Sequence, residues 1–194
     1  MMIFKMQVIL KNETKRGFCI MPEKQTYVKD AITEGLLKLM SDKPYAKISV
    51  SDICEKAGVN RSTYYRHFYT KEDIIRYYLD GIMNSYLLKF RNSGEQTIEG
   101  YLGIMFSEFM QNKDNLLLIH REQLSYLLID VLNKHFSVSD ISDTADQFRT
   151  AYHIGGIYND LLLWFSHGMA ETAEEMVRYT MKFQIPSDVS LFRQ

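Results

Sequence analysis

The stretch ISVSDICEKAGVNRSTYYRHFYTKEDII, residues 48–75, decides the fold of this chain. It holds two short amphipathic segments, residues 50–57 and residues 61–68, with Gly58 in the corner that joins them. Glycine adopts the left-handed backbone conformation without a steric penalty, so it suits a sharp turn between helices. Two short helices joined in this way form a helix-turn-helix, whose second helix is presented at the surface.

Polar residues that favour helix N-termini stand where three helices would begin. Ser49 precedes the first short segment, Asn60 precedes the second, and Thr70 precedes a longer segment. The side chains of such residues accept a hydrogen bond from a backbone N–H of the first helical turn. Asp52 and Asp73 follow Ser49 and Thr70 by three residues, which resembles the acidic half of a capping box. We therefore predict that a third helix follows residue 70.

The second short helix has an apolar face and a polar face. Val59, Tyr64 and Phe68 have the spacing to pack inward against Ile53 and Ala57. The other side chains of the corner and the helix are expected to face outward: Asn60, Arg61, Ser62, Thr63, Tyr65, Arg66 and His67. Packing alone explains poorly why a short helix would expose so many hydrogen-bonding side chains, whereas contact with a DNA groove uses them.

Helical periodicity continues through most of the chain. We expect further helices near residues 24–40, 70–91, 97–111, 113–120, 121–134, 142–167 and 172–183. Pro44 cannot continue the first of these, and Gly168 stands where a helix would end. With only 3 prolines and 10 glycines, the chain has few breakers. We therefore predict an all-α fold, with an N-terminal three-helix helix-turn-helix domain and a larger C-terminal helical domain.

The two parts of the chain carry opposite charge. Residues 1–71 hold 13 Lys and Arg against 7 Asp and Glu, whereas residues 72–194 hold 10 against 17. The basic part (+6) can meet phosphates while the acidic part (−7) stays away from them. Cys19 and Cys54 have no metal-ligand spacing. No transmembrane span, signal peptide or catalytic motif is evident, so we expect a cytoplasmic protein that is not an enzyme and needs no metal or cofactor.

At this point the sequence resembles the TetR family (TetR/AcrR-like) of transcriptional regulators. The resemblance covers about residues 27–83. Its motif is met by Ala57-Gly58-Val59, Thr63, Tyr64-Tyr65, His67-Phe68 and Lys71. The later stretch YHIGGIYNDLLLWFSHGMAETAEEM also looks like the regulatory domain of a Firmicutes-type TetR subgroup. One departure is Ser62, which stands where the family usually has a small Gly or Pro.

The resemblance implies a set of DNA contacts. Arg61, Ser62 and Thr63 match positions that face base edges or nearby phosphates, and Arg61 is the candidate reader of guanine. Phosphate contacts are implied for Tyr65, His67 and Lys71. At the start of the preceding helix, hydroxyls and backbone N–H groups meet phosphate. The whole predicted DNA-binding set is Ser49, Ser51, Asn60, Arg61, Ser62, Thr63, Tyr65, His67 and Lys71.

The C-terminal domain is expected to hold an effector and the dimer interface. Candidate ligand-binding residues are Met83, Tyr86, Tyr101, Met105, Phe109, His120, Tyr126, Tyr152 and His153. Apolar residues at helical spacing are also what an ordinary core requires. Candidate dimer-interface residues are Ile154, Ile157, Tyr158, Leu161, Phe165, Met176, Tyr179 and Phe183, although an intrachain core is an equal reading. Gly155-Gly156 predicts either a kinked helix or a close approach of two helices.

These features predict a homodimeric, sequence-specific DNA-binding regulator with a double-stranded operator as its partner. We expect domains at residues 22–70 for DNA binding and 71–194 for ligand binding and dimerisation, after an extension at residues 1–21 that is either a basic arm or an irregular segment. Release of a repressor by a small hydrophobic or aromatic effector is the default mechanism. The alternatives are a transcriptional activator, or a protein-interaction module on the same fold, without a small-molecule inducer.

Overall fold

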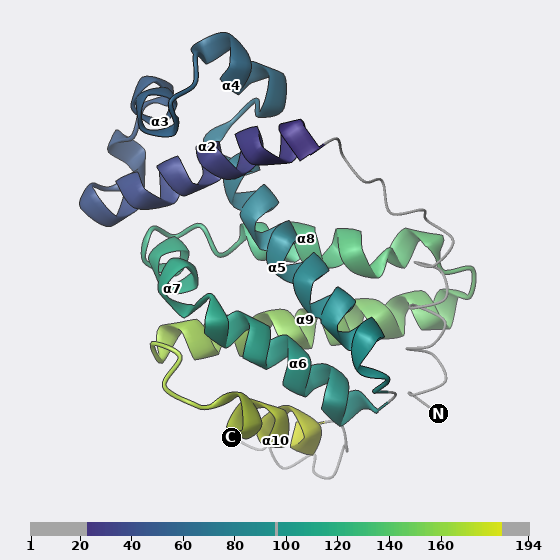
Figure 1. The fold of residues 1–194 in the computed structure, drawn as a ribbon. Helices are drawn as coiled ribbons and strands as arrows, with labels where there is room; N and C mark the ends of the chain where they lie inside the picture. Colours follow the sequence, from purple (N-terminus) through teal and green to yellow (C-terminus); the bar gives the residue numbers. More distant parts are fainter. Residues whose placement is uncertain (1–22, 96, 184–194) are drawn as a thin grey trace.

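A computed structural model describes residues 23–95 and 97–183, and within these residues every regular element is a helix (Figure 1). The prediction of an all-α fold is therefore confirmed. The elements in chain order are α2 (Glu23–Asp42), the 3₁₀ helix η1 (Tyr45–Lys47), α3 (Val50–Ala57), α4 (Arg61–His67), α5 (Lys71–Ser93), α6 (Ile98–Gln111), α7 (Lys113–Arg121), α8 (Leu127–Phe136), the 3₁₀ helix η2 (Val138–Asp140), α9 (Thr144–Ser166) and α10 (Ala173–Phe183). The extension at residues 1–21 lies outside the described residues.

The predicted helix caps are present. The Ser49 hydroxyl accepts the Asp52 N–H at 3.2 Å, and the Asp52 carboxylate accepts the Ser49 N–H at 2.8 Å. Thr70 and Asp73 form the same reciprocal pair at the start of α5, with distances of 3.2 and 2.9 Å. These boxes satisfy backbone donors that have no partner within a helix. They fix where α3 and α5 begin.

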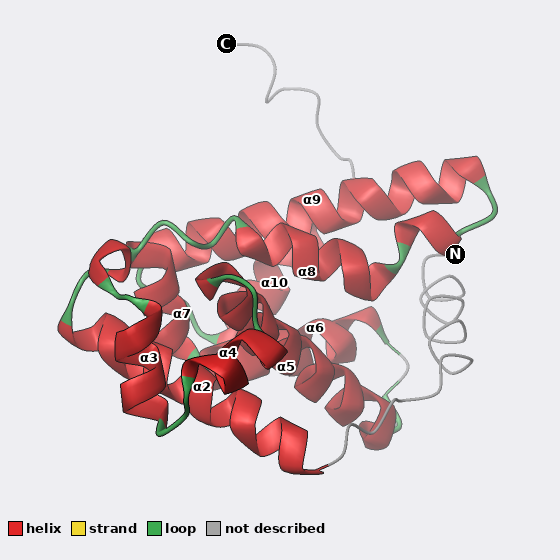
Figure 2. Ribbon diagram, turned by 90° about the horizontal axis from the view of Figure 1, so that it is seen from above, coloured by secondary structure: helices red, strands yellow, loops and turns green. Residues whose placement is uncertain are grey.

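The helices gather in two groups. Helices α2, α3 and α4 lie together at one end of the molecule, and α5 leads from them into the larger group (Figure 1). There α5 packs against α6 and α8, while α9 packs against α7 and α8, and α10 packs against α6. Seen from above, α8 and α9 run side by side (Figure 2). One continuous apolar core extends from α2 to α10.

One expected helix begins later than its sequence pattern indicates. Residues 121–134 were predicted to be helical throughout, but α7 ends at Arg121 and α8 begins at Leu127. The break is a Schellman turn, in which the Gln123 N–H donates to the His120 carbonyl and the Leu124 N–H donates to the Ile119 carbonyl, each at 3.0 Å. Gln123 adopts the left-handed conformation, with φ of 62°. A glutamine gives no sequence signal for such a turn.

None of the described helices combines the length and the apolar character that crossing a membrane requires.

Candidate nucleic-acid interface

The corner between α3 and α4 is built by local backbone geometry. Gly58 lies in the left-handed region with φ of 65°, and the Val59 N–H donates to the Cys54 carbonyl at 3.0 Å. The Asn60 side chain then accepts the Thr63 N–H at 2.8 Å and caps α4. The turn and the cap together fix the angle at which α4 leaves α3. The predicted helix-turn-helix geometry is therefore present.

The inner face of α4 anchors this short helix. Tyr64 is fully buried, and Phe68 is buried beside it with ring centroids 6.4 Å apart. Phe68 also meets the edge of Tyr77 on α5 at 5.8 Å. Burial raises the pKa of the Tyr64 hydroxyl to about 12, so this group stays neutral. A helix of 7 residues is marginal in isolation, and these contacts hold it in place.

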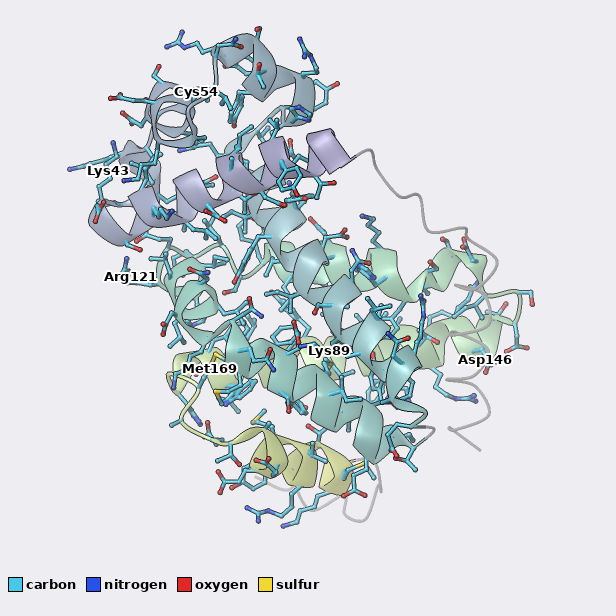
Figure 3. The ribbon with its side chains drawn as sticks, in the orientation of Figure 1. Lys43, Cys54, Lys89, Arg121, Asp146 and Met169 are labelled. Atoms are coloured by element: carbon cyan, nitrogen blue, oxygen red, sulfur yellow. The ribbon has the colours of Figure 1, made fainter. Side chains whose placement is uncertain are left out.

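The outer face of α4 is polar and open. Arg61, Ser62, Tyr65 and Arg66 are exposed, and 52% of the Tyr65 surface is accessible. Thr63 and His67 are half-buried, and Asn60 is exposed at the start of the helix. Side chains at this end of the molecule project away from the remaining helices (Figure 3). The predicted division of α4 into an inner and an outer face is correct.

Two predicted contact residues meet each other across the corner. The Arg61 guanidinium donates a hydrogen bond to the Ser51 hydroxyl on α3, and the Ser62 hydroxyl donates to the side-chain amide oxygen (Oδ1) of Asn60 at 2.7 Å. A guanidinium has five N–H donors, so Arg61 keeps donors for another acceptor. These bonds hold the polar side chains of α3 and α4 in one surface.

The Lys71 side chain is held by contacts within the chain and does not simply extend into solvent. Its ammonium donates to the carbonyls of Tyr45 and Ile48 at 3.0 and 2.8 Å. The same group lies 4.2 Å from the centre of the Tyr45 ring, a distance typical of a cation–π contact. An ammonium has three donors, and these carbonyls use two of them. Lys71 therefore fastens η1 and the residue after it to the start of α5.

His67 sits beside basic neighbours at the end of α4. Partial burial, followed by the charges of Lys29 and Arg66, holds the pKa of His67 below its usual range. The ring is therefore neutral at physiological pH. A neutral imidazole offers one hydrogen-bond donor and one acceptor.

Exposed aromatic and basic side chains around α4 were missing from the predicted DNA-binding set. Tyr69, just after α4, is 86% exposed, and Tyr27 on α2 is 73% exposed. Arg66 was expected to face outward but was not assigned a contact, and it is exposed. Tyr69 follows the buried Phe68 directly, so helical spacing could not indicate its direction. The only available signal was the presence of a tyrosine directly after the motif.

The predicted ligand-binding residues divide into a buried set and an exposed set. Buried residues from α5 and α6 pack together: Met83, Tyr86, Tyr101, Met105 and Phe109. The hydroxyls of Tyr86 and Tyr101 are 2.9 Å apart. His120 and His153 are half-buried, and burial followed by the Arg149 charge lowers the pKa of His153.

Tyr126 and Tyr152 correct the ligand-binding prediction. They are 52% and 80% exposed, so neither lines the interior of this chain. The reason is that an aromatic residue at helical spacing carries no sign of which face the fold will cover. Among the described residues, no group of three or more His, Cys, Asp or Glu is placed to hold a metal ion.

The predicted dimer residues also need correction. Four of them are buried within one chain: Ile154, Leu161, Phe165 and Met176. Phe165, for example, stacks on Phe109 of α6 with ring centroids 6.5 Å apart. Helical periodicity cannot distinguish a stripe that packs within the chain from one that packs against a second subunit. These four residues pack within the chain. Ile157 and Tyr158 are half-buried and Tyr179 is 39% exposed, while the Phe183 side chain lies outside the described part of the chain.

Helix α9 has a second apolar face that no other element of the described chain covers. Phe148, Tyr152 and Leu163 on it are 75%, 80% and 58% exposed. Gly155 and Gly156 lie between them, and a Cβ built on either would meet no atom within 4 Å. Since α9 runs without interruption from Thr144 to Ser166, the two glycines do not break the helix. They leave a smooth surface on it.

An exposed second helix on an anchored helix-turn-helix, followed by a larger helical domain, defines a class of DNA-binding regulators. Residues 32–78 match the family model described as bacterial regulatory proteins, tetR family. The regulator EthR of Mycobacterium tuberculosis is 41% identical over 54 residues, which are 28% of this chain and 25% of EthR. The uncharacterized regulator YerO of Bacillus subtilis is 24% identical over 108 residues, covering 50% of this chain and 36% of YerO.

Solved structures share the fold over most of the chain. Lin0861 from Listeria innocua aligns with a TM-score of 0.71 at 18% identity, covering 90% of this chain and 94% of that one. A TetR transcriptional regulator from Streptococcus agalactiae aligns with a TM-score of 0.56 at 22% identity, covering 82% and 94%. The comparisons therefore relate residues 32–78 to the tetR family of bacterial regulatory proteins, and relate the larger domain to solved structures by fold alone. The sequence match spans only about a quarter to a third of the curated relatives.

Proposed function

We propose that this protein is a homodimeric, sequence-specific DNA-binding regulator of transcription that works in the cytoplasm, where its DNA target lies. The observation that carries the proposal is the polar, exposed outer face of α4 on a helix whose inner face is fully anchored. Rigid presentation matters because base contacts discriminate only when the side chains are held in register. The match to the TetR family model covers this helix.

Each exposed group has a role in the proposed complex. Arg61 reads a guanine in the major groove, while Ser62 and Thr63 contact base edges or the adjacent backbone. Tyr65, His67 and the free donor of Lys71 bind phosphates. Ser49 and Ser51 meet phosphate at the N-terminus of α3, where the helix dipole favours an anion. Asn60 keeps its role as the α4 cap.

The exposed face of α9 supports the homodimer. Phe148, Tyr152 and Leu163 form an apolar stripe with the two open glycines between them, and a second copy of α9 can approach closely at glycine. Tyr179 on α10 extends the same surface in the proposed interface, a four-helix bundle built from two helices of each subunit. The dimer would present its two α4 helices to successive major grooves, about 34 Å apart.

The apolar centre of the larger domain supports a regulatory ligand. The Tyr86–Tyr101 hydroxyl pair lies among apolar side chains of α5 and α6, and a few polar groups in an apolar surround suit a small hydrophobic or aromatic effector. We propose repression as the sign of regulation, with the effector releasing DNA. The effector would do so by favouring a dimer whose α4 helices no longer fit adjacent grooves.

Fluorescence anisotropy with labelled fragments of the host genome tests DNA binding. The affinity should fall steeply with salt, because phosphate contacts release counterions. Arg61→Ala should cost about 1–3 kcal/mol on the preferred fragment, as expected for a lost bidentate base contact. Arg91→Ala, at the exposed C-terminal end of α5, is the control and should leave the DNA affinity unchanged. Equal binding by the wild type and Arg61→Ala on every fragment would contradict the proposal.

A further inference from the structure

The end of α7 contacts the DNA-binding helices from the regulatory side. The Arg121 guanidinium donates to the Met40 carbonyl in the last turns of α2 at 3.2 Å. The Glu122 carboxylate accepts the Tyr45 N–H, at the start of η1, at 2.9 Å. Figure 3 shows Arg121 where the end of α7 faces the end of α2, below Lys43. Two adjacent residues thus hold both ends of the connection between α2 and η1.

The corner that carries these residues is stiff. Glu122 is the C-cap of α7, and the Schellman turn at Gln123 and Leu124 closes the helix directly behind it. Leu124 is buried in the core. Glu122 itself has only 16% of its side chain exposed. The carboxylate therefore cannot move far unless the end of α7 moves with it.

Tyr45 also contacts the start of α5. Its hydroxyl donates to the Glu72 carboxylate at 2.7 Å, and its carbonyl accepts a hydrogen bond from Lys71. The Lys71 ammonium also lies over the Tyr45 ring. Tyr45 is buried. One buried residue is therefore bonded to Glu122 on one side and to two residues at the start of α5 on the other.

On its inner side the corner is tied to the regulatory core. The His120 Nδ1 lies 3.0 Å from the hydroxyl of the buried Ser125. The His120 ring lies 5.8 Å from the Phe165 ring on α9. A rearrangement of the core around Phe165 would therefore reach His120, which is two residues from Glu122 in the same terminal turn of α7.

We infer that the Glu122–Tyr45 hydrogen bond is the joint that sets the orientation of the α2–α4 group on the larger domain, with Glu122 as a positioning residue. A displacement of the α7 end then moves Tyr45 and Lys71 together, and with them the helix-turn-helix. The inference rests on the proposed function, because it gives a route by which the regulatory core controls DNA engagement. It assigns Glu122 no contact with DNA or effector.

The test compares the full-length wild type with Glu122→Ala, Glu122→Gln and the control Glu99→Ala, whose side chain is exposed on α6. Hydrogen exchange needs no DNA. The Tyr45 amide should exchange at least about tenfold faster in Glu122→Ala, because its buried acceptor is lost. Glutamine retains a carbonyl oxygen that can accept this bond, so Glu122→Gln should recover most of the protection. Glu99→Ala should match the wild type.

DNA binding then separates orientation from general damage. The probe is a duplex that the wild type selects from a random-sequence pool, compared with the same duplex after one half-site is scrambled. Glu122→Ala should lower the affinity for the complete site by about tenfold or more and leave the half-site affinity unchanged, because only simultaneous engagement needs correct orientation. Glu122→Gln should bind like the wild type.

The outcomes are distinguishable. The proposed role of Glu122 would be contradicted if the Tyr45 amide exchanged at the wild-type rate in Glu122→Ala. It would also be contradicted if Glu122→Ala lost the same affinity for the complete site and for the half-site. If the wild type selects no duplex, the proposed function fails, and the exchange measurement still decides whether Glu122 holds Tyr45. If Glu122→Ala does not fold, Arg121→Ala serves in its place. It should reduce complete-site affinity selectively through loss of the Met40 contact, and an equal loss on half-sites would overturn the joint.

Discussion

Replacing Lys71 with methionine should affect this protein in two separable ways, on stability and on DNA affinity. Methionine keeps the unbranched, apolar character of the lysine stem and removes the ammonium. The ammonium makes two hydrogen bonds to backbone carbonyls and one contact with the Tyr45 ring. Hydrogen bonds to charged groups contribute about 1.5–3 kcal/mol, and a cation–π contact adds about 0.5–1 kcal/mol at exposed sites.

Lys71 is only half-buried, so solvent screening reduces these contributions. We therefore expect Lys71→Met to lower the free energy of unfolding by about 2 kcal/mol, the low end of the range for charged hydrogen bonds. The assay is urea denaturation followed by circular dichroism. An exposed lysine on α10, Lys182, provides the control, because Lys182→Met removes a charge without removing a described hydrogen bond.

The effect on DNA binding is read from its salt dependence. If the third donor of Lys71 binds a phosphate, each subunit of the dimer loses one contact, and the slope of log K against log salt falls by about 0.9 per contact, or about 1.8 in total. Lys182→Met should leave the slope unchanged. An unchanged stability would refute the bracing role of Lys71. An unchanged slope with weakened binding would refute the phosphate contact and leave the lysine as a brace only.

Three further predictions concern the proposed dimer, the turn at Gly58 and the loss of stability at acidic pH. Leu163→Glu should weaken the proposed dimer roughly 100-fold, since two leucines lose about 1.5 kcal/mol or more of burial each; sedimentation velocity would show a monomer, and Leu88→Glu on α5 would leave the dimer intact. Gly58→Ala should cost about 1 kcal/mol in urea denaturation, because its φ of 65° disfavours a Cβ that otherwise has space. Burial opposes ionisation of Asp80, but hydrogen bonds from two basic α8 residues outweigh it and hold its pKa at about 2. The stability it contributes is therefore present above about pH 4 and lost as the pH falls towards about 2, and Asp80→Asn should flatten that part of the urea midpoint curve.

Local signals predicted the DNA-binding part of the fold well. Gly58 marked the turn, and Ser49, Asn60 and Thr70 marked the starts of three helices, because each of these features depends on residues at most five apart. The inner and outer faces of α4 followed from periodicity. The turn at Gln123 was missed because glutamine is uncommon in the left-handed conformation.

Contacts between distant residues could not be predicted. The bonds of Lys71 join residues 26 and 23 positions apart, and the bond between Tyr45 and Glu122 spans 77 positions. Helix α9 is apolar on two sides, so its periodicity fits a core stripe and a dimer seam equally. Only the tertiary structure shows that Phe165 faces the core while Leu163 is exposed.

Photocrosslinking from α4 tests the central claim most directly. Benzoylphenylalanine would replace Tyr65 in one variant and Tyr126 in another, two tyrosines that are each 52% exposed and lie in different groups of helices. After irradiation with a duplex selected by the wild type, the account predicts crosslinks to DNA from position 65 and none from position 126. Crosslinks from position 126 alone, or equal yields from both, would contradict the assignment of α4 as the helix that enters the groove.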